Sequence, residues 1–281
     1  MLEIIKAILF GIVEGITEWL PVSSTGHMIL LEEFVKLDVS KEFWNLFLVV
    51  IQLGAILASV ILFWNKIWPF QKPDKAKGKS IFQKDTWMLL FKVGVACIPG
   101  VFFALFGIDD ICDKYFYNPV GVSVALIVFG IIFILIEIWN KKRTPKLNDL
   151  GEMTFKLALM IGLFQLLAAA FPGTSRSGAT IIGALILGAS RTVASEFTFI
   201  LAIPAMLGAS VLELKDFLDA GIVMGGNEIA ILAAGIIVAF IVSIVVIKFL
   251  MGYIKKHDFT VFGWYRIVLG ICVLAYFLIF G

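Results

Sequence analysis

Charge, cysteine and histidine are all scarce in this sequence. Only 16% of the 281 residues are charged and 60% are hydrophobic, which excludes the composition of an average globular domain. The net charge of +2 is small and confined to a few loops, so we expect no nucleic-acid partner. Cys97, Cys112 and Cys272 form no close pair. The sequence therefore indicates neither a disulfide framework nor a metal-thiolate site.

Apolar runs of membrane-spanning length recur along the whole chain. A helix needs about 20 apolar residues to cross a hydrocarbon core of roughly 30 Å. These runs predict an all-α integral membrane protein with no separate soluble domain. The predicted full crossings are 43–64, 86–107, 119–139, 195–212, 229–251 and 263–280. Glu14 and Glu18 interrupt the first apolar run, and no small-residue cleavage site follows it, so we expect no cleavable signal peptide.

The charges of the loops predict the orientation of the crossings. Loop 65–85 carries six lysines, and excess lysine and arginine marks the cytoplasmic side. By the same rule, 140–150 and 252–262 are cytoplasmic. The acidic loops 108–118 and 213–228 fit the outer side.

Two re-entrant helical hairpins complete the predicted topology. An odd number of crossings must lie between the inner loop 140–150 and the outer loop 213–228, but the stretch 178–189 is too short to span. Residues 153–189 are therefore expected to enter and leave on the cytoplasmic side, broken at "FPGTSRSG". The N-terminal region, 1–37, has the same plan around "PVSSTG".

The two halves of the chain resemble each other weakly. A shift of 151 residues places Gly11 on Gly162 and Pro21 on Pro172, and it also places Ser23 on Thr174, Ser24 on Ser175 and Ala58-Ser59 on Ala209-Ser210. Each half has three full crossings, an odd number, so the halves have opposite orientations. Residues 1–140 and 151–281 are therefore predicted to be inverted-topology repeats whose hairpin tips meet near the midplane. The first hairpin would open to the extracytoplasmic side.

The two predicted tips carry groups suited to a phosphate. Non-helical backbone is tolerated at membrane depth only where it is buried or lines a polar cavity. Hydroxyl residues, Ser23, Ser24, Thr25, Thr174, Ser175 and Ser177, follow the prolines that end the first half-helices. The free N–H groups of the next half-helices suit an anion, and Arg176 adds a planar guanidinium.

A pair of acidic residues is predicted to face the same phosphate site. Glu14 and Glu18 are spaced i,i+4, so both project from one face of the first half-helix. Two carboxylates would repel a phosphate unless a divalent cation such as Mg²⁺ lies between them. His27 is the only histidine in a membrane segment and could act as a general acid or base, or as a nucleophile.

Each of these residues also has a plainer structural explanation. The hydroxyls could serve only as helix caps, the glutamates could be satisfied by Thr17, and Arg176 could pair with one of them. Gln165, which the repeat aligns with Glu14, could line the site or bond between helices.

The segments "EGITEWLPVSSTGH" and "PGTSRSGAT" resemble the signature segments of the bacterial undecaprenyl-pyrophosphate phosphatase family, also called bacitracin-resistance proteins. The resemblance extends to "VIQLGAILA" and "SEFTFILAIP", so it covers nearly the whole chain. It implies hydrolysis of undecaprenyl diphosphate to the monophosphate that is reused in peptidoglycan synthesis. It also implies Mg²⁺ or Ca²⁺, a homodimer in the bacterial plasma membrane, and ten helices in an inverted repeat.

The resemblance, together with the residue pattern of the two tips and the internal repeat, divides the site residues by role. The catalytic set is Ser24, His27, Glu18 and Arg176, and the metal ligands are Glu14 and Glu18. The expected phosphate-binding residues are Ser23, Thr25, Gly26, Thr174, Ser175, Ser177, Thr180 and Gln165. We expect Ser24 to be the nucleophile with His27 as its base, and the same spacing allows direct attack by His27.

Transport is the alternative function. Inverted repeats with broken helices are typical of secondary transporters and would suit a lipid-phosphate flippase, but a transporter needs no nucleophile. Another class of membrane lipid phosphatases uses two histidines in its site, and here only His27 is available.

Overall fold

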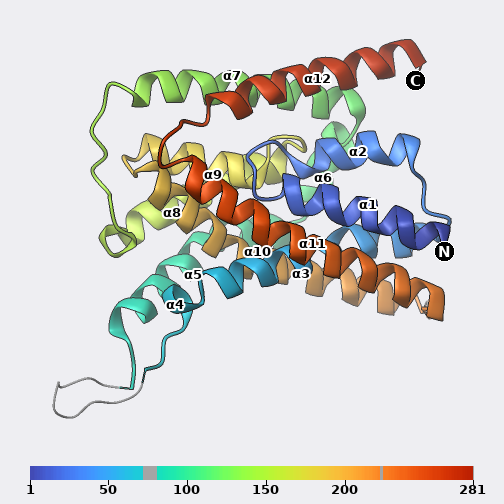
Figure 1. Cartoon of the computed structure of the whole chain (residues 1–281), viewed down its shortest axis with the longest axis horizontal. Coiled ribbons are helices and arrows are strands. Elements are labelled where there is room, and N and C mark those ends of the chain that lie inside the picture. Colours follow the sequence, from blue (N-terminus) through green and yellow to red (C-terminus); the bar gives the residue numbers. More distant parts are fainter. Residues whose placement is uncertain (72–80, 222–223, 281) are drawn as a thin grey trace.

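The computed structural model describes residues 1–71, 81–221 and 224–280, which fold into helices joined by turns and short loops (Figure 1). Six helices are long and apolar enough to cross a membrane: α3 (Lys41–Leu62), α5 (Lys84–Leu105), α7 (Pro119–Asn140), α10 (Arg191–Asp219), α11 (Gly226–Tyr253) and α12 (Thr260–Phe280). Each coincides with one of the six predicted crossings. The all-α class and the six membrane-capable helices are therefore confirmed for the described residues.

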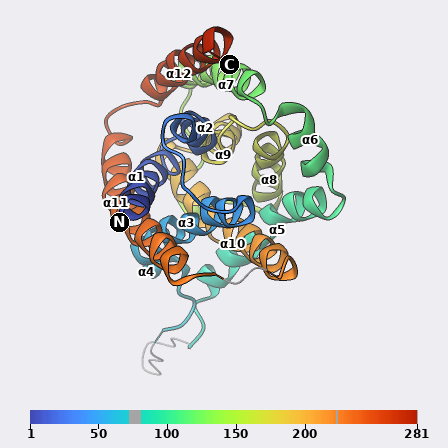
Figure 2. The ribbon, with the colours of Figure 1, turned by 90° about the vertical axis from the view of Figure 1, so that its right-hand side faces the viewer.

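Four shorter helices come in two consecutive pairs. The first pair is α1 (Leu2–Thr17) and α2 (Ser24–Phe34), and the second is α8 (Phe155–Ala170) and α9 (Arg176–Ile186). With 16 residues in α1 and α8 and 11 in α2 and α9, none reaches the length of a full crossing. In the end-on view of Figure 2, α2 and α9 lie inside the ring formed by the longer helices.

The segments between crossings differ partly from prediction. The predicted outer loop 108–118 contains a helix, α6 (Ile108–Phe116), which packs against α5, α7 and α8. Helix α10 continues to Asp219 and so takes up the start of the loop predicted from 213. Two short helical turns, α4 (Trp64–Ile67) and η2 (Leu150–Glu152), also lie within predicted loops. Several predicted positions lie outside the described residues: Lys72, Lys75, Lys77 and Lys79, residues 222–223 and Gly281.

Helix pairs far apart in the sequence form the largest contacts. Helix α1 packs along α11, α8 along α5, and α7 along α12. Glycine allows the backbones to approach at equivalent places: a Cβ atom at Gly11 would lie 2.6 Å from the carbonyl oxygen of Gly235, and one at Gly162 would lie 2.2 Å from that of Ala96. Small residues at such crossings are typical of membrane helix packing.

The α3–α10 crossing is held by two reciprocal hydrogen bonds. Ser59 Oγ on α3 donates to the carbonyl of Phe199 at 3.0 Å, and Ser210 Oγ on α10 donates to the carbonyl of Val49 at 3.4 Å. Because each serine bonds to the backbone of the other helix, α3 and α10 make equivalent contributions to the crossing.

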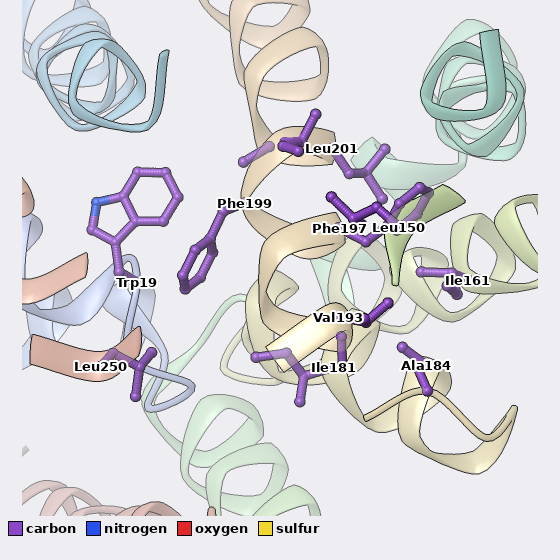
Figure 3. Packing of buried hydrophobic residues seen from close by; sticks show 14 of the residues in the cluster. Trp19, Leu150, Ile161, Ile181, Ala184, Val193, Phe197, Phe199, Leu201 and Leu250 are labelled. Carbon is purple, nitrogen blue, oxygen red and sulfur yellow. The ribbon is translucent and has the colours of Figure 1, made fainter. Parts of the chain in front are cut away.

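The largest cluster of buried apolar side chains lies around α9 and α10 (Figure 3). Trp19, which follows α1, is fully buried and meets Phe199 edge to face, with ring centroids 5.0 Å apart. The contact fixes the chain just after α1 against α10. In a membrane the stabilisation from this contact comes from close packing and from the favoured ring geometry, because lipid tails are as apolar as the core.

Candidate active site

The first break lies between α1 and α2. Helix α1 ends at Thr17, Glu18 is its C-cap, and the chain then turns through Pro21 to Ser23. Ser23 caps α2, and its hydroxyl accepts a hydrogen bond from the Gly26 N–H at 3.4 Å. Its φ of +73° is a sparsely populated backbone conformation for a residue with a Cβ atom.

The second break repeats this geometry. Ser175 caps α9 with φ of +72°, and its hydroxyl accepts from the Gly178 N–H at 3.1 Å. Within the described residues, Ser23 and Ser175 are the only non-glycine residues with positive φ. The structural equivalent of Ser23 is therefore Ser175, not Thr174 as the 151-residue shift predicts. Strain of about 1–3 kcal/mol at such positions is typical of functional sites.

Glu18 joins the two breaks. The Ser24 hydroxyl donates to Glu18 Oε2 at 2.9 Å, and Arg176 Nη2 donates to Glu18 Oε1 at 2.6 Å. The Ser177 hydroxyl donates to the Glu18 backbone carbonyl at 3.2 Å. Four of the predicted site residues, separated by up to 159 positions in the chain, are thus in one hydrogen-bonded cluster.

Arg176 keeps one donor nitrogen free. Its Nη2 contacts Glu18 and the Met206 sulfur, but its buried Nη1 has no hydrogen-bond partner in the described part of the chain. A buried guanidinium nitrogen without an acceptor is costly. An additional anionic oxygen at this position would remove that cost.

Glu14 is also left without a partner. It lies one helical turn before Glu18, is 1% exposed, and its buried Oε1 accepts no hydrogen bond from the described residues. Those residues contain no cluster of three or more His, Cys, Asp or Glu side chains that could hold a metal alone. The donor set of two neighbouring carboxylates fits a hard cation whose remaining ligands are water and substrate oxygens.

His27 does not hydrogen-bond to Ser24 in this structure. Its Nδ1 lies 2.7 Å from the Ser23 carbonyl oxygen, and its Nε2 lies 2.7 Å from the Tyr265 hydroxyl on α12. A carbonyl can only accept, so Nδ1 carries the proton, and in the neutral ring Nε2 accepts from Tyr265. Ser24 instead has Glu18 as its hydrogen-bond acceptor.

The other predicted phosphate-binding residues have different surroundings. The Thr180 hydroxyl is fully buried, donates to the Arg176 carbonyl at 2.9 Å and accepts from Thr198. Buried oxygens of Thr174 and Gln165 have no hydrogen-bond partner in the described ranges.

Three further predicted residues lie on the first turn of α2 or at the cap of α9. Thr25 is half-buried on the first turn of α2. A Cβ atom at Gly26 would lie 3.0 Å from Leu126 on α7, so this glycine allows close packing. The Ser175 hydroxyl lies 3.1 Å from that of Ser177.

Arg266 on α12 is a site residue that the sequence analysis missed. It is fully buried, and it donates from Nη1 to the Pro21 carbonyl at 3.3 Å and from Nη2 to the Gly173 carbonyl at 2.9 Å. It therefore ties one break to the other. The available signal was an arginine within an apolar crossing, a position where ionisable residues are functional by default.

The two helix breaks are tied together by a buried arginine. They bring a carboxylate, a hydroxyl and a guanidinium within hydrogen-bond reach of one another. The class is therefore a multi-pass helical membrane protein with an internal polar site. The family model described as bacitracin resistance protein BacA matches residues 7–272. The chain belongs to this family, as the signature segments predict.

Relatives of known name are similar over nearly the full chain. A protein named undecaprenyl-diphosphatase from Desulfitobacterium hafniense is 58% identical over 277 residues, which cover 99% of this chain and 97% of that protein. One of the same name from Lachnoclostridium phytofermentans is 56% identical over 278 residues, covering 99% and 98%. Another, from Enterococcus faecalis, is 58% identical over 275 residues, covering 97% and 96%.

Proposed function

We propose that this protein hydrolyses undecaprenyl diphosphate to undecaprenyl phosphate and inorganic phosphate, which recycles the lipid carrier for peptidoglycan synthesis and confers bacitracin resistance. The names of its full-length relatives support the reaction. The observation that carries the proposal is the cluster of Glu18, Ser24 and Arg176 where the two breaks meet.

In the proposed mechanism Ser24 attacks the terminal phosphorus. Its hydroxyl already donates to Glu18 Oε2, so Glu18 takes the proton as the new P–O bond forms. The bond to the bridging oxygen breaks, and undecaprenyl phosphate leaves. Water then cleaves the phosphoserine, releasing inorganic phosphate, and Ser24 regains a proton. His27 acts as the base only if its ring leaves Tyr265 and turns toward Ser24.

Arg176 stabilises the charge that develops on the phosphoryl oxygens. Its free Nη1 supplies one donor, and the N–H groups at the starts of α2 and α9 supply others.

We also propose that Glu14 and Glu18 hold Mg²⁺ or Ca²⁺. The orphaned Oε1 of Glu14 supports this assignment, and a bound cation would neutralise charge on the diphosphate. We also propose, from their places at or near the two breaks, that the remaining expected residues bind phosphate: Ser23, Thr25, Gly26, Thr174, Ser175, Ser177, Thr180 and Gln165.

The inverted repeat is the proposed architecture. In this architecture the helices of the first half correspond in order to those of the second: α1, α2, α3, α5 and α7 to α8, α9, α10, α11 and α12. Exchanging corresponding helices turns the α1–α11 contact into the α8–α5 contact. The same exchange maps the α7–α12 and α3–α10 contacts onto themselves. These correspondences, the two capping serines and the reciprocal bonds of Ser59 and Ser210 support two repeats at 1–140 and 151–281 with re-entrant hairpins.

We further propose a homodimer in the bacterial plasma membrane, with the first hairpin open to the extracytoplasmic side. Single cysteines at Asp38 and Lys142, in a background without Cys97, Cys112 and Cys272, test the sidedness. An impermeant thiol reagent should label only the Asp38→Cys variant in intact cells, and labelling of only Lys142→Cys would invert the topology.

Phosphate release by the purified chain in detergent tests the function. Detergent micelles have no gradient and no sides, so a transporter would release nothing. We expect phosphate release from undecaprenyl diphosphate that is lost in the Ser24→Ala variant. An intact, folded chain that releases no phosphate would favour a lipid-phosphate flippase instead.

A further inference from the structure

A polar pocket lies away from the two breaks, at one end of the helix bundle. Its volume is about 450 Å³. Figure 1 shows the C-terminal ends of α7 and α11 and the N-terminal end of α12 on the same side of the molecule. The pocket is lined by residues at the ends of α7 and α11, at the starts of α10 and α12, and in the α11–α12 loop.

A buried carboxylate organises this pocket. Glu137 on α7 is 0% exposed and accepts hydrogen bonds from Arg191 Nε at 2.9 Å and from the Phe259 backbone N–H at 3.1 Å. These bonds join the end of α7 to the start of α10 and to the α11–α12 loop. The pocket wall is therefore fixed by two helices and a loop that are joined through one buried carboxylate.

The lining has an excess of positive charge. It contains four lysine or arginine side chains and one carboxylate, Asp258, which pairs with Lys141 at 2.8 Å. Arg191 is paired with Glu137 behind the wall. Lys255 and Lys256 are exposed and belong to none of the ion pairs of the described residues. The two lysines are available to an anionic ligand.

Apolar and aromatic groups share the pocket with these charges. Tyr253 stacks on the His257 ring, with centroids 4.4 Å apart, and Ile254 and Val261 complete the lining. Nearby, the Arg143 guanidinium lies 4.0 Å above the Trp139 ring at the end of α7. Exposed aromatic and basic residues at the ends of membrane-spanning helices are typical of the headgroup level of a bilayer.

We propose that this pocket binds the phosphate of an anionic phospholipid headgroup from the surrounding leaflet. The phosphodiester lies against Lys255, Lys256 and the exposed part of Arg191, while the glycerol and the first acyl carbons contact Ile254 and Val261. Lysines at the membrane surface favour anionic lipids by about five-fold each. A lipid held here would bridge the start of α10, the end of α11 and the start of α12.

Native mass spectrometry of the full chain in detergent tests the proposal. The probes are phosphatidylglycerol, phosphatidylcholine and inorganic phosphate. The test variant is Lys255→Gln with Lys256→Gln. The control is Lys41→Gln with Lys114→Gln, which removes the same charge from exposed positions on α3 and α6.

The expected result is tighter binding of phosphatidylglycerol than of phosphatidylcholine. The test variant should weaken the first phosphatidylglycerol about 25-fold, and the control should not. Phosphate release should be unchanged in both variants, which shows that they are folded. Equal weakening in both variants, no preference over phosphatidylcholine, or variant-sensitive binding of inorganic phosphate without phosphatidylglycerol would each overturn the proposal.

Discussion

Replacing Arg176 by lysine separates the two tasks that its guanidinium has in this structure. The ion pair with Glu18 needs only a positive charge near Oε1, which is 2.6 Å from Nη2. The free Nη1 donor is a second prong that a lysine cannot supply. We therefore expect the Arg176→Lys variant to remain folded and to lose turnover.

The magnitudes follow from burial. The side chains of Arg176 and Glu18 are 16% and 9% exposed, so Arg176→Ala leaves a buried carboxylate whose main partner is gone. That loss costs about 3–5 kcal/mol of stability. Arg176→Lys keeps most of that stability but should lower kcat about 100-fold or more, as when one donor to a developing oxyanion is removed.

Phosphate release and thermal unfolding of the detergent-solubilised protein measure the two effects. Arg191→Lys is the matched control, because Arg191 also bonds to a buried carboxylate, Glu137, but lies away from the breaks. It should lower the unfolding temperature and leave kcat unchanged. Near-normal kcat in Arg176→Lys would show that charge alone is needed and would refute the two-prong reasoning.

Three other substitutions probe the metal, the nucleophile and the packing. Glu14→Gln should raise the Mg²⁺ concentration for half-maximal phosphate release by about ten-fold, and an unchanged requirement would argue against a metal at Glu14. Acid quenching of a turnover with terminally labelled substrate should leave label on the native chain and none on Ser24→Ala. Acid-labile, base-stable label that vanishes in His27→Ala would identify a phosphohistidine instead. Gly54→Ala should destabilise the fold by about 1–3 kcal/mol, because the new methyl would lie 2.2 Å from the Ile236 carbonyl oxygen. Gly94→Ala is the control, because its methyl enters open space and should not destabilise the fold. Equal unfolding temperatures of the two variants would contradict this packing.

Length and hydropathy were sufficient to predict the six crossings, because each depends only on a local run of apolar residues. The two breaks were predictable for the same reason, since a proline followed by hydroxyls is a local signal. Helix α6 was not, because its segment is polar enough to be a loop and becomes helical by packing on α5, α7 and α8.

The contacts inside the site were only partly predictable. Spacing along a helix favours a Ser24–His27 pair, but the ring of His27 bends back to the Ser23 carbonyl, four residues earlier. That leaves Ser24 to Glu18, which lies across the break. The partners of Arg266 were not predictable because they are two backbone carbonyls. Every residue has a backbone carbonyl, so no residue type in the sequence indicates this contact.

The position of Arg266 also bears on biosynthesis. It lies on α12, which follows both breaks in the chain, and its two acceptors belong to Pro21 and Gly173. A nascent chain that has inserted both breaks still lacks the group that fixes one against the other. The two breaks are therefore tied together only after α12 has been made and inserted, and a chain truncated before Thr260 would lack this tie.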